Sequence, residues 1–440
     1  MPSTTGPQAA TPDVQRTLEA VWRMEAAKVT AVVARVVGDV GLAEDLAQDA
    51  FVQALEQWPR DGIPTKPGAW LTATARRRAV DRIRRDVNLS AKLQQVGHLE
   101  ELRVAELAEG DFDAALEDVD DDVLGLVFAA CHPALTAQAR ICLTLRMIGG
   151  LTTREIARAF LTTESTVAQR ISRAKKTLSQ DGVTVEVPSG AELAPRLASV
   201  LEVVYLVFNE GYAATTGRDW VRGDLMEEAI RLGRVLAALA PAEPEVHGLL
   251  ALMEIQASRT RARIGRDGEP VLLLEQDRSL WDHALIRHAL AALDRAVALL
   301  EAARSSAGPY VLQAAIASCH ARARTADATD WARIAALYAQ LGGLRPSPVV
   351  ELNRAVALSY AKGPEAALEV VDALAATGEL SDYHLLPSVR GDLLERLGHD
   401  EQARAEFARA ASMAQNDVEK ALLLRRADGA TGATGAQGAG

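Results

Sequence analysis

Residues 151–178 read LTTREIARAFLTTESTVAQRISRAKKTL and predict two short helices joined by a tight turn. Thr152, with Glu155 three residues later, forms the pattern of a capping box, so the first helix should begin there. The hydroxyl of Thr162 or Thr163 can cap the second helix. Apolar residues then recur at helical spacing and should face a core; they are Val167, Ile171, Ala174 and Leu178.

The other side of the second helix carries side chains suited to a DNA major groove. Thr166, Gln169, Arg170 and Arg173 recur at i, i+3, i+4 and i+7, followed by Lys175 and Lys176 in reach of phosphates. Many solvated surface helices have a similar polar face. A capped helix, a short turn and a basic second helix together favour a helix-turn-helix that reads DNA.

The composition indicates an almost entirely helical protein of several domains. The chain has 440 residues, 49% of them apolar and only 4% aromatic, which suits helices better than strands. The net charge is −11, so any DNA contact must be local. The three cysteines lack CxxC spacing, and we expect neither a metal site nor a cofactor. Without a signal sequence or a long apolar run, a cytoplasmic protein with no membrane contact is expected.

Two charged helices are predicted ahead of the helix-turn-helix. The first, GLAEDLAQDAFVQALEQWP from Gly41, has an unbroken apolar stripe and an acidic, amide-rich face that composition alone assigns to solvent. The second, AWLTATARRRAVDRIRRD, spans Ala69 to Asp86. It carries cations on two faces, which suits a nucleic-acid strand passing over it, although a solubilising helix is the alternative.

The order of acidic helix, basic helix, acidic linker and helix-turn-helix resembles the bacterial extracytoplasmic-function sigma factors over about residues 14–180. AEDLAQDAF, residues 43–51, looks like the segment that docks on the clamp helices of core RNA polymerase. AWLTATARRRAVDRIRRD is similar to the segment that melts and reads the promoter hexamer nearest the start site. Residues 151–178 look like the domain that reads the hexamer further upstream.

This resemblance implies a role for particular residues. The polymerase contacts would be Asp45, Gln48 and Asp49. The residues that contact the promoter backbone or assist melting would be Arg76, Arg77, Arg84 and Arg85. The upstream readers would be Thr166, Gln169, Arg170 and Arg173, with Lys175 and Lys176 on phosphates. Arg77 stands where the family often has asparagine, so no base-specific role is carried onto it.

The C-terminal half contains a helical repeat. Ala355, Leu358, Ala367, Val371 and Leu374 match Gly391, Leu394, Ala403, Phe407 and Ala410 at a constant offset of 36 residues. This pattern resembles the tetratricopeptide repeat (TPR), whose helix pairs stack into a solenoid that can bind a protein partner. The whole chain is similar to the sigma factors with a long TPR-like C-terminal extension, which implies that the extension regulates activity.

The expected organisation is two small helical sigma domains followed by an α-helical TPR-like solenoid. The expected ranges are sigma region 2 at 14–86, an acidic linker at 87–119, sigma region 4 at 120–180, the middle of the extension at 191–304, repeats at 305–427 and a disordered tail at 428–440.

Two other functions are compatible with parts of the sequence. A helix-turn-helix regulator with a ligand- or partner-sensing helical domain would need no polymerase contact. An enzyme would place its chemistry between residues 200 and 300, with Asp277 and His283 as the acid and base. The absence of a nucleotide-binding loop, an HExxH motif and a nucleophile motif argues against the enzyme.

Overall fold

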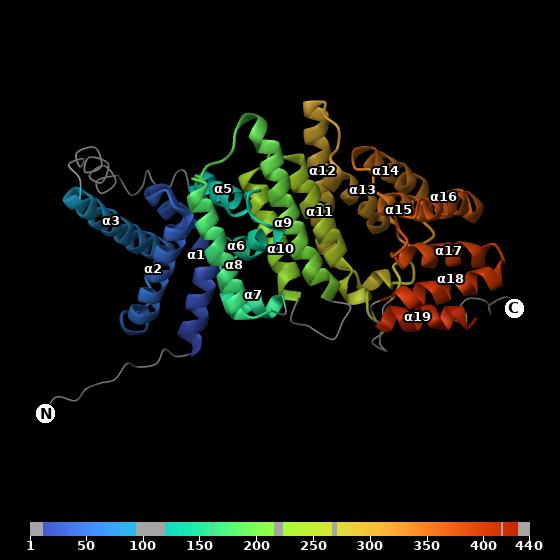
Figure 1. Ribbon diagram of the computed structural model, residues 1–440, viewed down its shortest axis with the longest axis horizontal. Coiled ribbons are helices and arrows are strands. Elements are labelled where there is room, and N and C mark those ends of the chain that lie inside the picture. The colour runs from blue at the N-terminus through green and yellow to red at the C-terminus, as the bar shows by residue number, and fades with distance from the viewer. Residues whose placement is uncertain are drawn as a thin grey trace. The chain divides into compact units, whose positions relative to one another are not determined.

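The computed structural model describes residues 12–93, 119–160, 162–214, 223–265, 271–414 and 417–429. Within these ranges the regular elements are all helical, which confirms the predicted fold class. The chain divides into two compact units, Met1–Ala240 and Pro241–Gly440, called unit 1 and unit 2 below. Figure 1 labels the helices of both units.

The first three helices of unit 1 are α1 (Pro12–Val37), α2 (Val40–Asp61) and α3 (Pro67–Leu93), which pack on one another. Asp39 caps α2 by accepting a hydrogen bond from the amide of Leu42 at 2.7 Å. The residues that fill the shared core include Val29, Val33, Ala43, Ala47, Ala50, Leu71, Ala75 and Ala79. The apolar stripe predicted for the acidic helix α2 therefore lies in the core, and the basic helix α3 adds Leu71, Ala75 and Ala79 to it.

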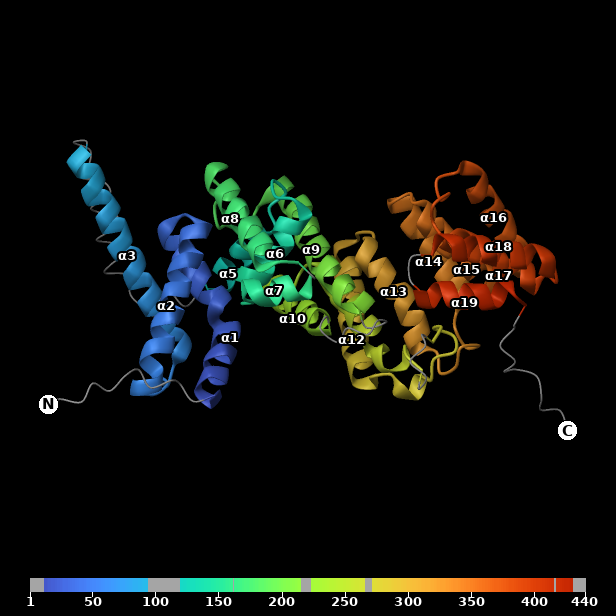
Figure 2. The same ribbon diagram turned by 60° about the horizontal axis from the view of Figure 1, so that its bottom comes forward.

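Four helices follow: α5 (Val119–Ala130), α6 (Ala137–Met147), α7 (Thr153–Ala159) and α8 (Glu164–Gln180). The predicted capping box of α7 is confirmed, because Thr152 and Glu155 exchange both hydrogen bonds. Thr163 is the cap of α8, and all four apolar residues predicted for this helix are buried. Figure 2 shows α6, α7 and α8 gathered together as a helix-turn-helix domain.

Unit 1 also includes α9 (Leu193–Ala214) and α10 (Gly223–Leu239), which lie in the range that the sequence assigned to the extension. Ser199 of α9 donates to the carbonyl of Cys131 at 2.6 Å, and Arg196 donates to the carbonyl of Phe128 at 3.1 Å. Arg231 of α10 donates to the carbonyl of Ile148 at 3.1 Å. These side chains satisfy the otherwise unpaired carbonyls at the ends of α5 and α6, so α9 and α10 complete the helix-turn-helix domain.

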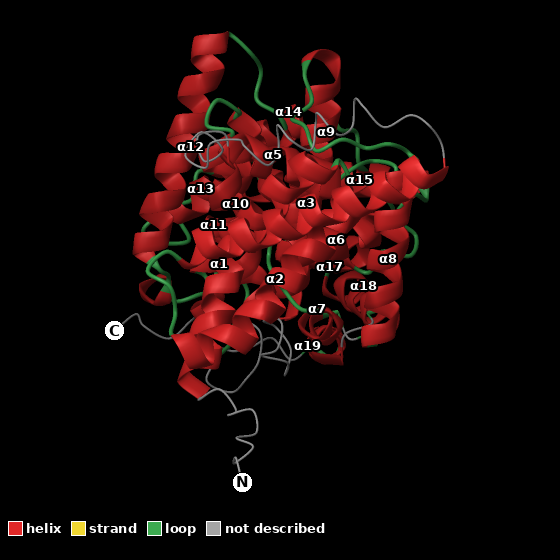
Figure 3. Cartoon of the chain, turned by 90° about the vertical axis from the view of Figure 1, so that its left-hand side faces the viewer, coloured by secondary structure: helices red, strands yellow, loops and turns green. Residues whose placement is uncertain are grey.

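Unit 2 consists of helices joined mostly by short turns. They are α11 (Pro244–Ser258), η4 (Thr260–Ala262), η5 (Arg278–Leu280), α12 (His283–Ala303), α13 (Pro309–Arg322), α14 (Trp331–Leu344), α15 (Pro348–Ala361), α16 (Pro364–Thr377), α17 (Leu385–Arg396), α18 (Asp400–Met413) and α19 (Asp417–Ala427). Figure 3 shows the helical character of the described parts of both units. Each helix from α13 onward packs on the next one along the chain, which is the pairing expected of a solenoid.

The 36-residue period corresponds to the pairs α15–α16 and α17–α18. Gly391 on α17 lets the ring of Phe407 on α18 approach closely, since a Cβ built at Gly391 would lie 2.8 Å from that ring. Pairing also occurs earlier than the sequence signal suggested. Gly248 on α11 lies against Val311 on α13, where a Cβ would meet the Val311 backbone at 2.7 Å. A long connection, residues 259–282, separates α11 from α12 and hides the period there.

Two predicted segments fall largely outside the described residues. Of the acidic linker at 87–119, only 87–93 and Val119 are described, and α3 continues to Leu93 beyond the predicted boundary at residue 86. Of the tail at 428–440, only Asp428 and Gly429 are described. Among the described helices, none is both long and apolar enough to span a bilayer.

Candidate polymerase and nucleic-acid interfaces

The acidic face of α2 displays the predicted polymerase contacts. Asp45 and Asp49 are exposed and Gln48 is half-buried, all on the side of α2 turned away from the core. Asp49 pairs with Arg78 of α3 at 3.2 Å, and Arg78 also donates to Gln53 at 3.1 Å. This face is thus an ordered array of carboxylate and amide groups that a cationic or polar helix of another protein can contact.

The arginines of the basic helix α3 differ in their exposure to solvent. Arg77, Arg84 and Arg85 are exposed, while Arg76 is half-buried. The guanidinium of Arg85 donates to the carbonyl of Asp81 within the same helix at 3.2 Å. Exposed guanidinium groups along one helix can neutralise successive phosphates of a nucleic-acid strand.

The second helix of the helix-turn-helix keeps only part of its predicted reading face open. Gln169, Arg173 and Lys176 are exposed. Thr166 is half-buried, and its hydroxyl hydrogen-bonds the capping Thr163 hydroxyl at 2.8 Å. Arg170 lies against the thiol of Cys142 on α6. Burial raises the pKa of that thiol, and the neighbouring guanidinium opposes the shift.

Lys175 of α8 lies in a different setting from Lys176, because it reaches α2. Its ammonium bonds the carboxylates of Glu44 and of Asp45, the latter at 2.8 Å. Burial disfavours the charged ammonium, but these carboxylates outweigh it, and the pKa of Lys175 is raised above its ordinary value. Arg146 of α6 adds a second cation, with its Nε 2.9 Å from the Glu44 carboxylate.

Glu44 and Arg146 are residues that the sequence reasoning missed. Glu44 lies on the acidic face of α2 that composition assigns to solvent, and for this residue the assignment is wrong, because Glu44 is only 3% exposed. Their 102-residue separation hides the pair from any local pattern, and the only signal in the sequence is a carboxylate next to the apolar stripe of α2.

In unit 2, the two residues that an enzyme would use for acid–base chemistry lie where helices begin. They are Asp277, ahead of η5, and His283, the first residue of α12. Asp277 accepts from the amide of Ser279 and caps η5; hydrogen bonds from Ser279 lower the pKa of its carboxyl. Asp282 caps α12, which begins at His283. The neighbouring Arg278 binds the carbonyls of His320 and Ala323, at 2.6 and 2.7 Å, and stacks over the ring of Trp281. These contacts hold η5 against the end of α13, so Arg278 has a structural role in helix packing.

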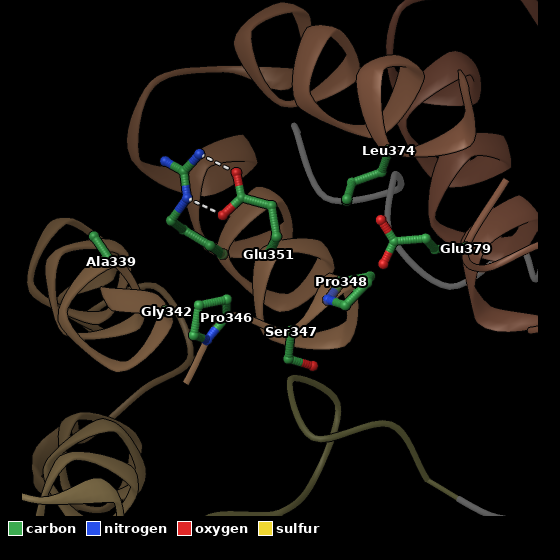
Figure 4. A pocket seen from close by; sticks show the side chains of 9 residues that line it. Ala339, Gly342, Pro346, Ser347, Pro348, Glu351, Leu374 and Glu379 are labelled. Carbon is green, nitrogen blue, oxygen red and sulfur yellow. Dashed lines mark hydrogen bonds and ion pairs between the residues drawn. The ribbon is translucent and has the colours of Figure 1, made fainter. Parts of the chain in front are cut away.

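A cavity of about 470 Å³ opens in unit 2 between α14, α15 and α16 (Figure 4). Its wall includes Gly342, Pro346 and an ion pair between Glu351 and Arg354. Hydrogen bonding to Arg354 lowers the pKa of Glu351, so the carboxylate stays charged at neutral pH. The charges of Glu351 and Arg354 therefore balance each other in the cavity wall.

Comparison with known proteins identifies both N-terminal domains. Residues 21–88 match sigma-70 region 2 and residues 126–178 match sigma-70, region 4. Residues 196–297 match a family of unknown function, DUF6596. The helices α1–α3 and α5–α8 are therefore the two domains of a sigma-70-type transcription initiation factor, a class without catalytic activity that acts with core RNA polymerase on promoter DNA.

Relatives refine this assignment. The chain is 30% identical over 193 residues to the ECF RNA polymerase sigma factor SigK of Mycobacterium ulcerans, covering 40% of this chain and 96% of the relative. SigK of Mycobacterium tuberculosis is 31% identical over 163 residues, covering 34% of this chain and 78% of the relative. The chain belongs to the ECF sigma factor family and carries a long helical C-terminal extension, as the resemblance predicted.

The extension is shared with a protein of similar length. The uncharacterized protein R00370 of Rhizobium meliloti is 46% identical over 393 residues, covering 89% of this chain and 90% of the relative. No solved structure matches the chain.

Proposed function

We propose that this sigma factor docks on core RNA polymerase through Asp45, Gln48 and Asp49 of α2. The observation that supports this most directly is the exposed acidic and amide face of α2, on the opposite side from the core of a helix matched by sigma-70 region 2. Such a face can bind a cationic surface and set the register of the complex.

Promoter DNA would then be contacted by two helices. Arg76, Arg77, Arg84 and Arg85 of α3 would follow the backbone of the strand that separates near the start site. Thr166, Gln169, Arg170 and Arg173 of α8 would read the upstream element, with lysines on phosphates. Each of these two helices would bind DNA weakly on its own. Binding becomes specific when the polymerase holds both helices at a fixed separation on one duplex.

Unit 2 would set the activity of unit 1 by binding a protein partner on its stacked helix pairs. Support comes from the successive packing of α13 to α19 and from the open cavity between α14, α15 and α16. Stacked pairs of this kind present a long surface that can hold an extended or helical segment.

The test is run-off transcription with purified core polymerase and the DNA upstream of the protein's own gene. It compares the full chain with a truncation after Ala240, the boundary between the compact units. A specific transcript from either form supports initiation. A yield that differs at least threefold between the forms supports regulation by unit 2, and equal yields would exclude it.

If no transcript forms, co-elution with core polymerase shows whether the protein still binds polymerase or acts as a DNA-binding regulator without it. If Asp49→Arg abolishes co-elution, the docking face is correct. If neither the unchanged protein nor the Asp49→Arg variant co-elutes with polymerase, although both bind the DNA, the protein is better described as a helix-turn-helix regulator.

A further inference from the structure

A buried charge cluster joins the two sigma domains within unit 1. Glu44 of α2 accepts from Arg146 of α6 at 2.9 Å and from Lys175 of α8. Lys175 also bonds the exposed carboxylate of Asp45 at 2.8 Å. The Glu44 side chain is 4% exposed and those of Arg146 and Lys175 are 15% and 17% exposed, so the cluster is largely shielded from solvent.

Close packing surrounds the cluster. Gly41 lies so near α8 that a Cβ built on it would be 3.1 Å from the Cβ of Lys175. Val185, which follows α8, packs against the core of α1–α3. A second ion pair, Arg23 to Glu155, joins α1 to α7 at 2.5 Å. The helix-turn-helix domain is thus seated on α1 and α2 by backbone approach, apolar contact and charge.

This domain contact occupies two groups that the proposed function assigns to other partners, the Asp45 carboxylate and the Lys175 ammonium. Asp45 cannot offer its carboxylate fully to polymerase while it holds Lys175. Lys175 cannot reach a phosphate while it holds two carboxylates. The edge of the docking face at Asp45 therefore lies against α8 in this arrangement.

We propose that the free protein engages one edge of its own polymerase-docking helix, at Asp45, with Glu44, Arg146 and Lys175 as a latch that core polymerase must open. The proposal rests on the proposed function, because masking matters only if α2 is the docking helix. Opening frees Lys175 for DNA at the same step that frees Asp45 for polymerase. One contact would thus couple polymerase binding to readiness for the promoter.

The energetics suit a latch rather than a permanent joint. Buried ion pairs gain little net stability, because the lost hydration of each charge offsets most of the attraction. Opening returns Glu44 and both cations to water, so a partner with moderate affinity for α2 can drive it. The apparent affinity for polymerase is the affinity of the open form multiplied by the fraction of molecules that are open.

A reversible crosslink tests the latch. In the full chain carrying Gly41→Cys and Lys175→Cys, the separation of 3.1 Å between the two Cβ positions needs to widen by only a few tenths of an ångström to suit a disulfide. The native cysteines, Cys131, Cys142 and Cys319, are all buried. Oxidised glutathione should crosslink the free protein, and adding core polymerase first should slow the reaction. The matched control is Gly41→Cys with Lys176→Cys, which places the second thiol on an exposed neighbour and should not crosslink.

The readout is core polymerase binding by the oxidised and the reduced forms of the same protein. The oxidised form should bind at least about tenfold more weakly, and reduction should restore binding. Failure to crosslink, or equal binding by the two forms, would overturn the latch. If neither form binds polymerase, the proposed function itself is wrong and the masking falls with it, whereas crosslinking still reports whether the domains touch.

A second variant covers the case in which the cysteine pair misfolds. Glu44→Gln removes the central charge of the latch and keeps the shape of the side chain. It should tighten polymerase binding several-fold relative to Glu56→Gln, an exposed position on the same helix. Unchanged or weaker binding by Glu44→Gln would contradict the inference.

Discussion

His320 in unit 2 is the residue whose titration should make this protein sensitive to acid. Burial, together with the guanidinium groups of Arg259 and Arg278, lowers the pKa of His320 from 6.5 to about 4. The unfolded chain therefore binds a proton that the folded chain rejects. The stability contributed by neutral His320 is present above pH 6.5 and is lost as the pH falls toward 4.

We expect unit 2 to lose about 2 kcal/mol of unfolding free energy between pH 7 and pH 5 through this residue. In His320→Phe, the phenylalanine ring can keep the edge-to-face contact with Trp331 but cannot take up a proton, so the substitution should remove most of that pH dependence. Urea unfolding followed by circular dichroism at the two pH values checks this. The exposed His399→Gln should behave like the parent; equal pH dependence in His320→Phe would refute the assignment.

Glycine substitutions also act at the residue scale, and their sign depends on the neighbours. Gly391→Ala should destabilise unit 2 by roughly 1–3 kcal/mol, because its Cβ would press on the Phe407 ring at 2.8 Å. Gly343→Ala in α14 meets nothing within 4 Å and should be neutral or stabilising, since alanine favours a helix. Thermal unfolding of the two variants checks the contrast, and an equal response would contradict it.

At the scale of single elements, α3 should act as an electrostatic contact with separated promoter DNA. Arg84→Ala should weaken polymerase–promoter complexes for all promoter sequences alike. It should also reduce the slope of log affinity against log salt by about 0.7 to 0.9. Filter binding at several salt concentrations measures both quantities. A loss confined to one promoter sequence would instead indicate base reading by Arg84.

The elements were the part of the structure that the sequence predicted well. The apolar stripes of α2, α3 and α8 and the cap at Thr152 follow local rules of period and hydrogen bonding, so they were visible without a structure. The environment of Glu44 was not visible. Its burial depends on Arg146 and Lys175, which approach only after the two domains pack, and no local pattern encodes that.

At the scale of the whole molecule, the compact units decide where the chain can be cut. A truncation after Gly190 removes α9 and α10 and should expose the apolar surface that they cover. The buried apolar side chains of α9 that would be lost with it are Leu197, Val200, Leu201, Val203, Val204, Val207 and Phe208. Each such side chain contributes about 1.5–3 kcal/mol when buried.

We therefore expect the 1–190 protein to aggregate and the 1–240 protein to stay folded and monodisperse. Size-exclusion chromatography with light scattering distinguishes these results. A soluble, helical 1–190 protein would show that α9 and α10 are dispensable for the helix-turn-helix domain.

The placement of α9 and α10 inside unit 1 also bears on how such chains are recombined. A chimera that joins the promoter-reading part of one relative to the extension of another has its natural junction near residue 240. A junction directly after α8 would instead pair one parent's Cys131 and Phe128 carbonyls with the other parent's Ser199 and Arg196. A junction near residue 240 keeps α9 and α10 with the domain whose carbonyl groups they satisfy.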